Sequence, residues 1–285
     1  MDDAATITIG LGQMTVVGGQ REINLATAER FIAEAARLGC TVLVLPECLD
    51  LGWTHGSAAT LAEPIPGPTV ERLCDAARRH WLHVVAGLVE RDGDRCYNAA
   101  VLIDPGGTIL LKHRKINELE IAHHLYALGT RLETVVTAFG VVGIPICADC
   151  LPASTVLGHS LARMGAQLLL SPCAWAVPAD WDNVATPYGG TWNRSYGELA
   201  RPYRMTVVGA SNVGRLTDGP WAGRPCIGAS RAVGPDGGLL LECAFGETAE
   251  ELRTITVPVL QPDRRGTGLS EHLKCRVVAR TPPEA

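Results

Sequence analysis

Residues 39–47 read GCTVLVLPE, and residues 165–172 return to the same pattern as GAQLLLSP. In each copy a glycine leads into a short run of aliphatic and β-branched residues, which is typical of a buried strand. The first copy closes on Glu47, so a carboxylate is expected to emerge into the loop where that strand ends. The repeat indicates a duplicated half-domain in which only one copy carries chemistry.

The elements around these two stretches extend the repeat in both directions. For the first half, the patterns predict a helix that stops at Gly39, a helix at 68–80, and strands at 7–14, 41–45, 83–89, 97–103 and 108–113. DPGG at 104–107 joins the last two strands as an antiparallel hairpin. For the second half they predict helices at 153–164 and 191–204, strands at 141–147, 165–172 and 205–212, and a hairpin around GPDGG at 234–238.

Two such halves can bury the bare faces of their sheets against each other, because each sheet has helices on one side only. We therefore expect an α/β fold built as a four-layer αββα sandwich of two pseudo-symmetric halves. In this pairing Cys147 takes the position of Met14, and Glu47 takes that of Pro172. The folded domain is expected over residues 1–260, with residues 261–285 as a C-terminal extension.

Composition narrows the class of protein. Of the 285 residues, 47% are hydrophobic and 19% are charged, which is typical of a globular protein. A net charge of −5 and a pI near 5.9 argue against a nucleic-acid partner. The chain has no apolar run of about 18 residues, and it opens on MDDAATITIG without the basic start of a signal peptide. These features predict a cytoplasmic protein that acts on a small molecule, with neither nucleic acid nor membrane as a partner.

Three residues at the ends of predicted strands can work together: Glu47, Lys115 in LLKHRKI and Cys147 in VVGIPICAD. A free thiol with a pKa of about 8.5 is mostly protonated at pH 7, so a nucleophilic cysteine needs a base or a cation beside it. Glu47 is expected to take the thiol proton, and Lys115 with the backbone N–H of Ala148 is expected to hold the oxyanion. Glu47 would then protonate the leaving amine and activate water. The set predicts acyl transfer through a thioester on Cys147.

This ordered set resembles the nitrilase superfamily of carbon–nitrogen hydrolases, in its amidase-like branch. The resemblance covers about residues 7–259 and includes PE at 46–47, YNAA at 97–100, RK at 114–115, CAD at 147–149, SPCAW at 171–175, RPYRMTVVGASNVG at 201–214 and GASRAVGPDG at 228–237. It implies the αββα sandwich, the Glu, Lys and Cys triad, no metal or other cofactor, and a homodimer or larger homo-oligomer. Many members have a second glutamate shortly after the lysine; Glu118 and Glu120 are the candidates, and Glu120 is favoured.

The residues after the nucleophile bear on which bond is cut. In this family an Asp two positions after the cysteine is more usual in amide hydrolases than in nitrilases, so Asp149 favours a small linear amide that releases ammonia or an amine. N-carbamoyl amino acid hydrolases typically continue with basic residues that clamp a carboxylate, whereas this chain continues with Cys150, Leu151 and Pro152. An N-carbamoyl amidohydrolase, with Arg201 or Arg204 as a substitute clamp, and a nitrilase are the alternatives. The residues expected to bind substrate are Ala148, Trp53, Trp175 and Cys150.

Single motifs are compatible with other chemistry. Cys147 and Cys150 have the CxxC spacing of redox and zinc sites, but no second pair among the ten cysteines has it. GHSLA at 158–162 resembles a nucleophile elbow with Ser160 at its tip, but it lacks the second glycine and falls in a predicted helix. A non-catalytic binding protein with the same fold is the remaining alternative, and the presence of all three catalytic residues argues against it.

Overall fold

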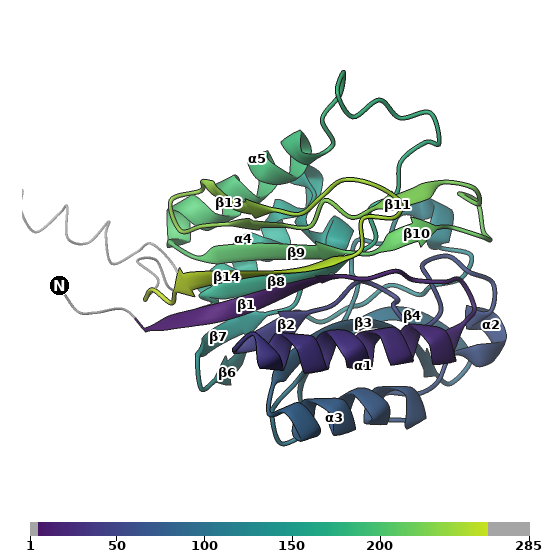
Figure 1. Ribbon diagram of the computed structural model, residues 1–285, viewed down its shortest axis with the longest axis horizontal. Coiled ribbons are helices and arrows are strands. Elements are labelled where there is room, and N and C mark those ends of the chain that lie inside the picture. Colours follow the sequence, from purple (N-terminus) through teal and green to yellow (C-terminus); the bar gives the residue numbers. More distant parts are fainter. Residues whose placement is uncertain (1–4, 262–285) are drawn as a thin grey trace, which may run out of the picture.

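The computed structural model describes residues 5–261, in which two sheets stack face to face between helices (Figure 1). Helices α1 (Arg21–Arg37) and α3 (Pro68–His80) cover the first sheet, and α4 (Thr155–Arg163) and α5 (Gly189–Ala200) cover the second. Along the chain, the short helix α2 (Ala58–Leu61) follows strand β2 (Val42–Val44) of the first sheet and precedes α3. The predicted four-layer αββα sandwich is confirmed.

Both sheets follow one plan. In the described residues the first sheet has six strands, in the order β14 (Glu251–Pro258), β1 (Thr6–Gln13), β2, β3 (His83–Asp92), β4 (Arg95–Ile103) and β5 (Ile109–Arg114). The second also has six, in the order β6 (Val135–Thr137), β7 (Gly140–Gly143), β8 (Leu168–Cys173), β9 (Thr206–Ser211), β12 (Arg231–Val233) and β13 (Leu239–Glu242). Each has three parallel strands, an antiparallel hairpin on one side and an antiparallel edge strand on the other. The predicted duplication is therefore present in the strand topology.

The strand registers decide which residues correspond between the halves. They place Cys147 at the position of Met14, as the sequence repeat predicted. They place Glu47 at the position of Cys173, so the expected match of Glu47 to Pro172 was wrong by one residue. Pro172 instead corresponds to Pro46. The residues that follow these two prolines are in contact, because the Glu47 N–H donates to the Cys173 carbonyl at 3.1 Å.

Alternation of apolar side chains along the strands explains the stacking. Val42 and Val44 belong to the inner cluster between the sheets, whereas Leu43 packs with Phe31 and Leu73 in the cluster under α1 and α3. This is the period of two that a strand imposes, since successive side chains point to opposite faces. Because the inner faces are apolar in both halves, each sheet needs the other to exclude water.

The strand predicted at 141–147 is shorter than expected. It ends with β7 at Gly143, and Cys147 begins the 3-10 helix η2 (Cys147–Cys150). Pro145 has no N–H to donate to a ladder, so pairing stops before the cysteine is reached. A second 3-10 helix, η3 (Pro152–Ser154), then leads into α4.

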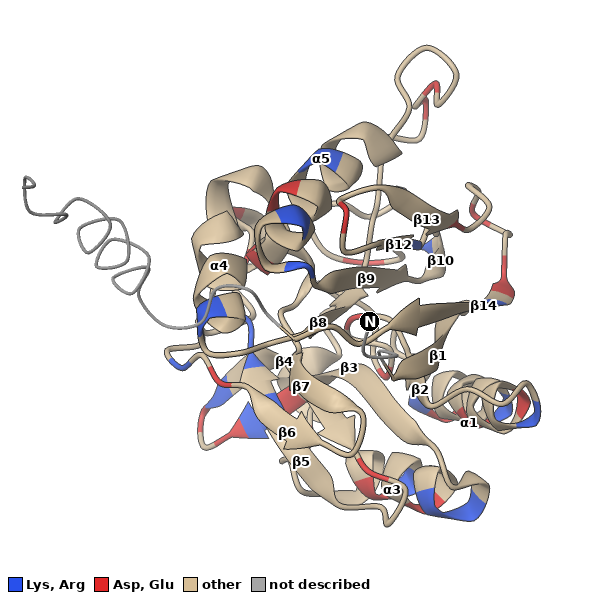
Figure 2. Ribbon diagram, turned by 90° about the vertical axis from the view of Figure 1, so that its left-hand side faces the viewer, with Lys and Arg blue, Asp and Glu red and all other residues tan. Residues whose placement is uncertain are grey.

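The surface of the described part carries mixed charge. Helices α1, α3 and α5 each carry both positively and negatively charged residues (Figure 2).

A small separate hairpin is formed by β10 (Val213–Arg215) and β11 (Pro225–Ile227). Between residues 5 and 261, no helix has both the length and the apolar character needed to cross a membrane. The predicted C-terminal extension lies, from residue 262 onward, outside the described residues.

Candidate active site

Three strand ends bring Glu47, Lys115 and Cys147 to the wall of one cavity of about 110 Å³. Glu47 follows β2, Lys115 directly follows β5, and Cys147 follows β7. Two of the three residues come from the first half and one from the second. The site therefore depends on the two sheets being stacked together.

Lys115 is held in a buried ion cluster. Its Nζ donates to Oε1 of Glu47 at 2.7 Å and to Oε1 of Glu118 at 3.1 Å. The Asn98 amide links the same two carboxylates, donating to Glu47 at 2.6 Å and to Glu118 at 2.8 Å. All four side chains are buried. Hydrogen bonds to charged groups are stronger than neutral ones, so this cluster fixes the orientation of both the carboxylate and the ammonium group at the cavity.

The carboxylate beside Lys115 is that of Glu118, which corrects the expectation for Glu120. Glu118 also accepts a hydrogen bond from the Trp53 indole at 3.3 Å. Glu120 is exposed, because the 3-10 helix η1 (Glu120–Ala122) begins at this residue and turns the chain. An extended chain would project both glutamates to the same side, so the turn between them could not be inferred from their spacing.

Cys147 occupies an unusual backbone position. Its φ of +42° lies in the left-handed region, which residues other than glycine rarely adopt. The Cys147 N–H donates to Oγ of Ser171 at 3.0 Å, and the thiol shares a hydrogen bond with that of Cys173. A tight, strained turn of this kind is a known way to present a nucleophile to a cavity.

Burial and neighbouring charge set the protonation of the resting site. Burial raises the pKa of the Glu47 carboxyl; Lys115 opposes that rise, and Glu118 adds to it. Burial alone would lower the pKa of Lys115, but Glu118 and Glu47 hold it well above its usual range. The hydrogen bond with Cys173, followed by burial, raises the pKa of the Cys147 thiol well above its usual range. The site thus rests with a neutral thiol and a charged ammonium group.

A buried carboxylate behind the site ties its loops together. Asp149 contributes both oxygens to hydrogen bonds of 2.8–3.2 Å, with the His113 ring and with the backbone N–H groups of Ile116, Asn117 and Ile146. Burial would raise the pKa of Asp149, but these bonds keep it below its usual value. Asp149 thereby holds the loop after Lys115 against the loop that carries Cys147.

Uncharged residues form the rest of the cavity wall: Trp53, Leu119, Ala148, Leu151, Ala174, Trp175, Ala176, Tyr188, Trp192 and Trp221. Three of the residues expected to bind substrate, Trp53, Trp175 and Ala148, are therefore placed at the cavity. Cys150 is a correction, since it is fully buried in the core beneath α4 and α5 and does not line the cavity. Arg201 and Arg204 are also absent from this wall.

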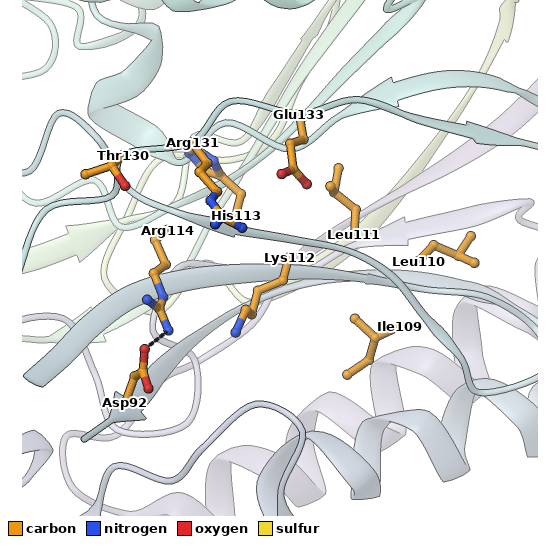
Figure 3. A pocket seen from close by; sticks show the side chains of 10 residues that line it. All are labelled: Asp92, Ile109, Leu110, Leu111, Lys112, His113, Arg114, Thr130, Arg131 and Glu133. Atoms are coloured by element: carbon orange, nitrogen blue, oxygen red, sulfur yellow. Dashed lines mark hydrogen bonds and ion pairs between the residues drawn. The ribbon is translucent and has the colours of Figure 1, made fainter.

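A larger cavity of about 600 Å³ lies along β5 (Figure 3). Its wall contains charged residues that already have partners: Arg114 pairs with Asp92 at 2.8 Å, and Lys112 pairs with Glu90. It is lined by neither cysteine nor serine. We assign the candidate active site to the smaller cavity, because a thiol, a carboxylate and an ammonium group meet there.

Four residues whose side chains support Glu47, Cys147 or Asp149 were not identified from the sequence as individuals: Asn98, His113, Ser171 and Cys173. Asn98 lies in the YNAA motif, and Ser171 and Cys173 lie in SPCAW, so the motifs marked the right segments. Their roles depend on contacts between distant parts of the chain, which the motifs do not specify.

The competing motifs do not form sites of their own. Ser160 lies inside α4, where its hydroxyl donates to the Val156 carbonyl at 2.8 Å, so it is not the tip of a nucleophile elbow. Within residues 5–261, no group of three or more His, Cys, Asp and Glu side chains is arranged to hold a metal ion.

Comparison with known proteins places this geometry in a family. The carbon-nitrogen hydrolase family model matches residues 8–265. Omega-amidase NIT2 of Danio rerio is 33% identical over 172 residues, which cover 56% of this chain and 61% of the relative. A nitrilase of Pyrococcus abyssi is 36% identical over 163 residues, which cover 54% of this chain and 60% of the relative. The matched segment therefore spans about three fifths of the length of these relatives.

Solved structures share the fold. The TM-score is 0.74 to a mutant of the Nesterenkonia AN1 amidase, with 22% identity, and the match covers 88% of this chain and 90% of that one. It is 0.73 to Saccharomyces cerevisiae Nit3, a member of the nitrilase superfamily, with 21% identity and coverage of 98% and 96%. Since the family model matches nearly the whole chain, the protein belongs to the carbon–nitrogen hydrolase family.

Proposed function

We propose that this protein is an amidase that hydrolyses the C–N bond of a small linear amide through a thioester on Cys147. The observation that carries the proposal is the meeting of Glu47, Lys115 and Cys147 at one cavity, with Lys115 bonded to Glu47 at 2.7 Å. Relatives described as amidases support the reaction class. In a mutant of the Nesterenkonia amidase, the acetamide moiety of fluoroacetamide is attached covalently at the active-site cysteine, which supports the same role for Cys147.

In the acylation step, Glu47 takes the proton of the Cys147 thiol as the sulfur attacks the amide carbon. Proton transfer and attack occur together, because the raised pKa of Cys147 leaves little thiolate in the resting protein. The ammonium group of Lys115 and the backbone N–H of Ala148 stabilise the oxyanion that forms. Glu47 then gives the proton to the leaving nitrogen, the C–N bond breaks, and ammonia or an amine departs.

In the second step, a water molecule enters the place of the leaving group. Glu47 removes a proton from it, and the resulting hydroxide attacks the thioester carbon. The C–S bond breaks, the carboxylic acid leaves, and the proton on Glu47 returns to the Cys147 sulfur. Asp149 and Asn98 act through other groups, by keeping the loops and the Glu47 carboxylate in position.

The test is mass spectrometry of the protein incubated with simple amides, combined with measurement of ammonia release. We expect a covalent acyl adduct on Cys147 and ammonia release that disappears in Cys147→Ala. Cys40→Ala is the matched control, since both cysteines are free and partly exposed, and it should keep full activity. Equal ammonia release by wild type and Cys147→Ala would reject the proposal.

The same experiment separates the alternative reactions when the corresponding nitriles and N-carbamoyl compounds are included. A nitrilase would consume the nitrile, and an N-carbamoyl amidohydrolase the ureide, faster than the amide. No reaction with any of them would favour a non-catalytic binding protein. The homodimer or larger assembly stays a prediction, to be checked by light scattering, as does the cytoplasmic location.

A further inference from the structure

The active-site cavity is a small space between aromatic rings. Apart from the three catalytic side chains, every residue in its wall is uncharged, and five of them are aromatic. Trp175 and Trp192 stack with ring centroids 4.8 Å apart, and Trp53 meets Trp221 edge to face at 5.4 Å. Tyr188 packs against Trp175 at 5.9 Å. The cavity of about 110 Å³ that remains holds roughly four water molecules at their liquid volume of about 30 Å³ each, enough for a short acyl chain.

The positive charge of Lys115 in the cavity wall is already paired with two carboxylates. Lys115 lies between the carboxylates of Glu47 and Glu118, at 2.7 and 3.1 Å. Both carboxylates accept hydrogen bonds from its ammonium group, so its charge is not free to hold a substrate carboxylate. A substrate carboxylate placed here would give up its water without gaining a cation, and an unpaired buried charge is far more costly than a neutral group of the same size.

Two arginines lie near the aromatic rings, but neither lines the cavity. The guanidinium of Arg231 is 5.5 Å from the centre of the Trp175 ring and is fully buried. Its donors are taken by the carbonyls of Ala229 and Gly189 and by the side chains of Asn193 and Glu242. Arg224 stacks on Trp221 at 4.1 Å. Neither supplies a guanidinium to the wall beside Cys147.

We infer that the site selects amides whose acyl group carries no charge, and that the rings of Trp53, Trp175 and Trp192 select them by excluding water from the space beside Cys147. The inference rests on the proposed amidase function and names its substrate class. A neutral aliphatic or aryl chain gains contact with the rings. A carboxylate at the far end of the same chain finds neither water nor a cation.

A set of three amides tests this inference at nearly constant shape. 4-Methylpentanamide and succinamate have the same branching and number of heavy atoms, with two methyl groups in the first where the second has carboxylate oxygens. Succinamide is a neutral polar molecule of the same size. We expect kcat/KM to be highest for 4-methylpentanamide, at least about 100-fold lower for succinamate, and about 10-fold higher for succinamide than for succinamate.

Binding to Cys147→Ala, followed by tryptophan fluorescence, separates this inference from the proposed function. Turnover of all three amides with succinamate equal to or better than 4-methylpentanamide would overturn the charge selection and leave the amidase function intact. Arg224→Ala would then show whether that guanidinium holds the carboxylate. Absence of turnover, together with tighter binding of 4-methylpentanamide than of succinamate, would reject the amidase function and support the inferred pocket.

A gain of function gives a second test. Leu151 lines the cavity, so Leu151→Arg places a cation in the wall, and Leu151→Met is the matched neutral control. We expect Leu151→Arg to raise the ratio of kcat/KM for succinamate over 4-methylpentanamide by about 10-fold, and Leu151→Met to leave the ratio within about twofold. An unchanged ratio in Leu151→Arg would mean that a missing cation is not the reason for exclusion.

Discussion

The catalytic corner and its counterpart in the other half share one backbone plan but differ in side chains. By strand register, Glu47, Lys115 and Cys147 are equivalent in position to Cys173, Phe245 and Met14 of the other corner. The register shift between β4 and β5 in the first sheet also has an equivalent between β12 and β13 in the second. The counterpart therefore has the geometry of a site but neither its base nor its cation.

The counterpart corner is closed by a single side chain. Gln13, at the end of β1, donates to the carbonyls of Ala249 and Ala244 at 2.7 and 2.8 Å, which ties β1 to the segment between β13 and β14. Gly228 makes room for it, since a Cβ at that residue would lie 2.2 Å from the Gln13 amide carbon. In the catalytic corner the equivalent of Gly228 is Asn98, whose amide instead binds Glu47 and Glu118. The comparison shows that one duplicated frame yields either a structural joint or a reactive site, depending on a few side chains.

The largest effect should come from removing the base in the catalytic corner. Glu47→Gln keeps the size of the side chain but cannot accept the thiol proton, so kcat for amide hydrolysis should fall about 1,000-fold. Met14→Leu in the counterpart corner should leave kcat within about threefold. Steady-state ammonia release measures both. A similar loss in the two variants would break the distinction between the corners.

The next effect distinguishes the two glutamates after Lys115. Glu118→Gln removes one of the charges that hold the ammonium group, and kcat should fall about 100-fold. Glu120→Gln should be within about twofold of wild type, because Glu120 is exposed. Kinetics of both variants, with circular dichroism to verify folding, provide the test. The reverse order of effects would restore Glu120 as the supporting residue.

Asp149 should matter for stability as well as position. Asp149→Asn weakens several buried hydrogen bonds at once, so the free energy of unfolding should fall by about 2 kcal/mol. The control is Glu22→Gln, which breaks a surface ion pair whose glutamate side chain is 81% exposed and should change the free energy by less than about 0.5 kcal/mol. Urea denaturation measures both. Equal changes would show that Asp149 does not hold the loops.

The smallest effect concerns the thiol that occupies the position of Glu47 in the second half. The hydrogen bond with Cys173 raises the pKa of Cys147, so Cys173→Ala should lower that pKa. The thiolate then forms at lower pH, and alkylation of Cys147 by iodoacetamide should begin at lower pH than in wild type. Peptide mass spectrometry over a pH series follows the modification. An unchanged or upward-shifted profile would contradict this role of Cys173.

Sequence reasoning predicted the layers, and it predicted that Glu47, Lys115 and Cys147 lie at one site, because their signals are local. The helix at 68–80 is predicted at its observed bounds, since its apolar period and flanking Pro68 lie within a few residues of each other. Glu47 and Lys115 are identified because each directly follows an apolar or alternating run. The ends of strands in two stacked sheets lie along a shared edge. The position of each residue just after its strand was therefore enough to predict that these side chains lie close together.

The two corrections to the site residues, Glu120 and Cys150, lie where the chain leaves regular structure. Glu118 and Glu120 differ in burial because a 3-10 helix begins at Glu120. Cys150 lies in the core because it ends another 3-10 helix. The pairing of His113 with Asp149 joins residues from opposite halves. Side-chain direction in short irregular segments depends on contacts made only after folding, and periodicity contains no information about them.

By itself, the sequence determined the duplicated αββα frame and marked Glu47, Lys115 and Cys147 as candidates for base, cation and nucleophile, because hydrophobic period and strand-end position are properties of neighbouring residues. Tertiary structure decided which glutamate supports Lys115, which thiol lies beside Cys147, and which rings enclose the cavity. These depend on the stacking of two sheets whose contacting residues are far apart in the chain. The reaction class is therefore readable from local order, whereas the charge of the acyl group that the site accepts depends on the packed walls around Cys147.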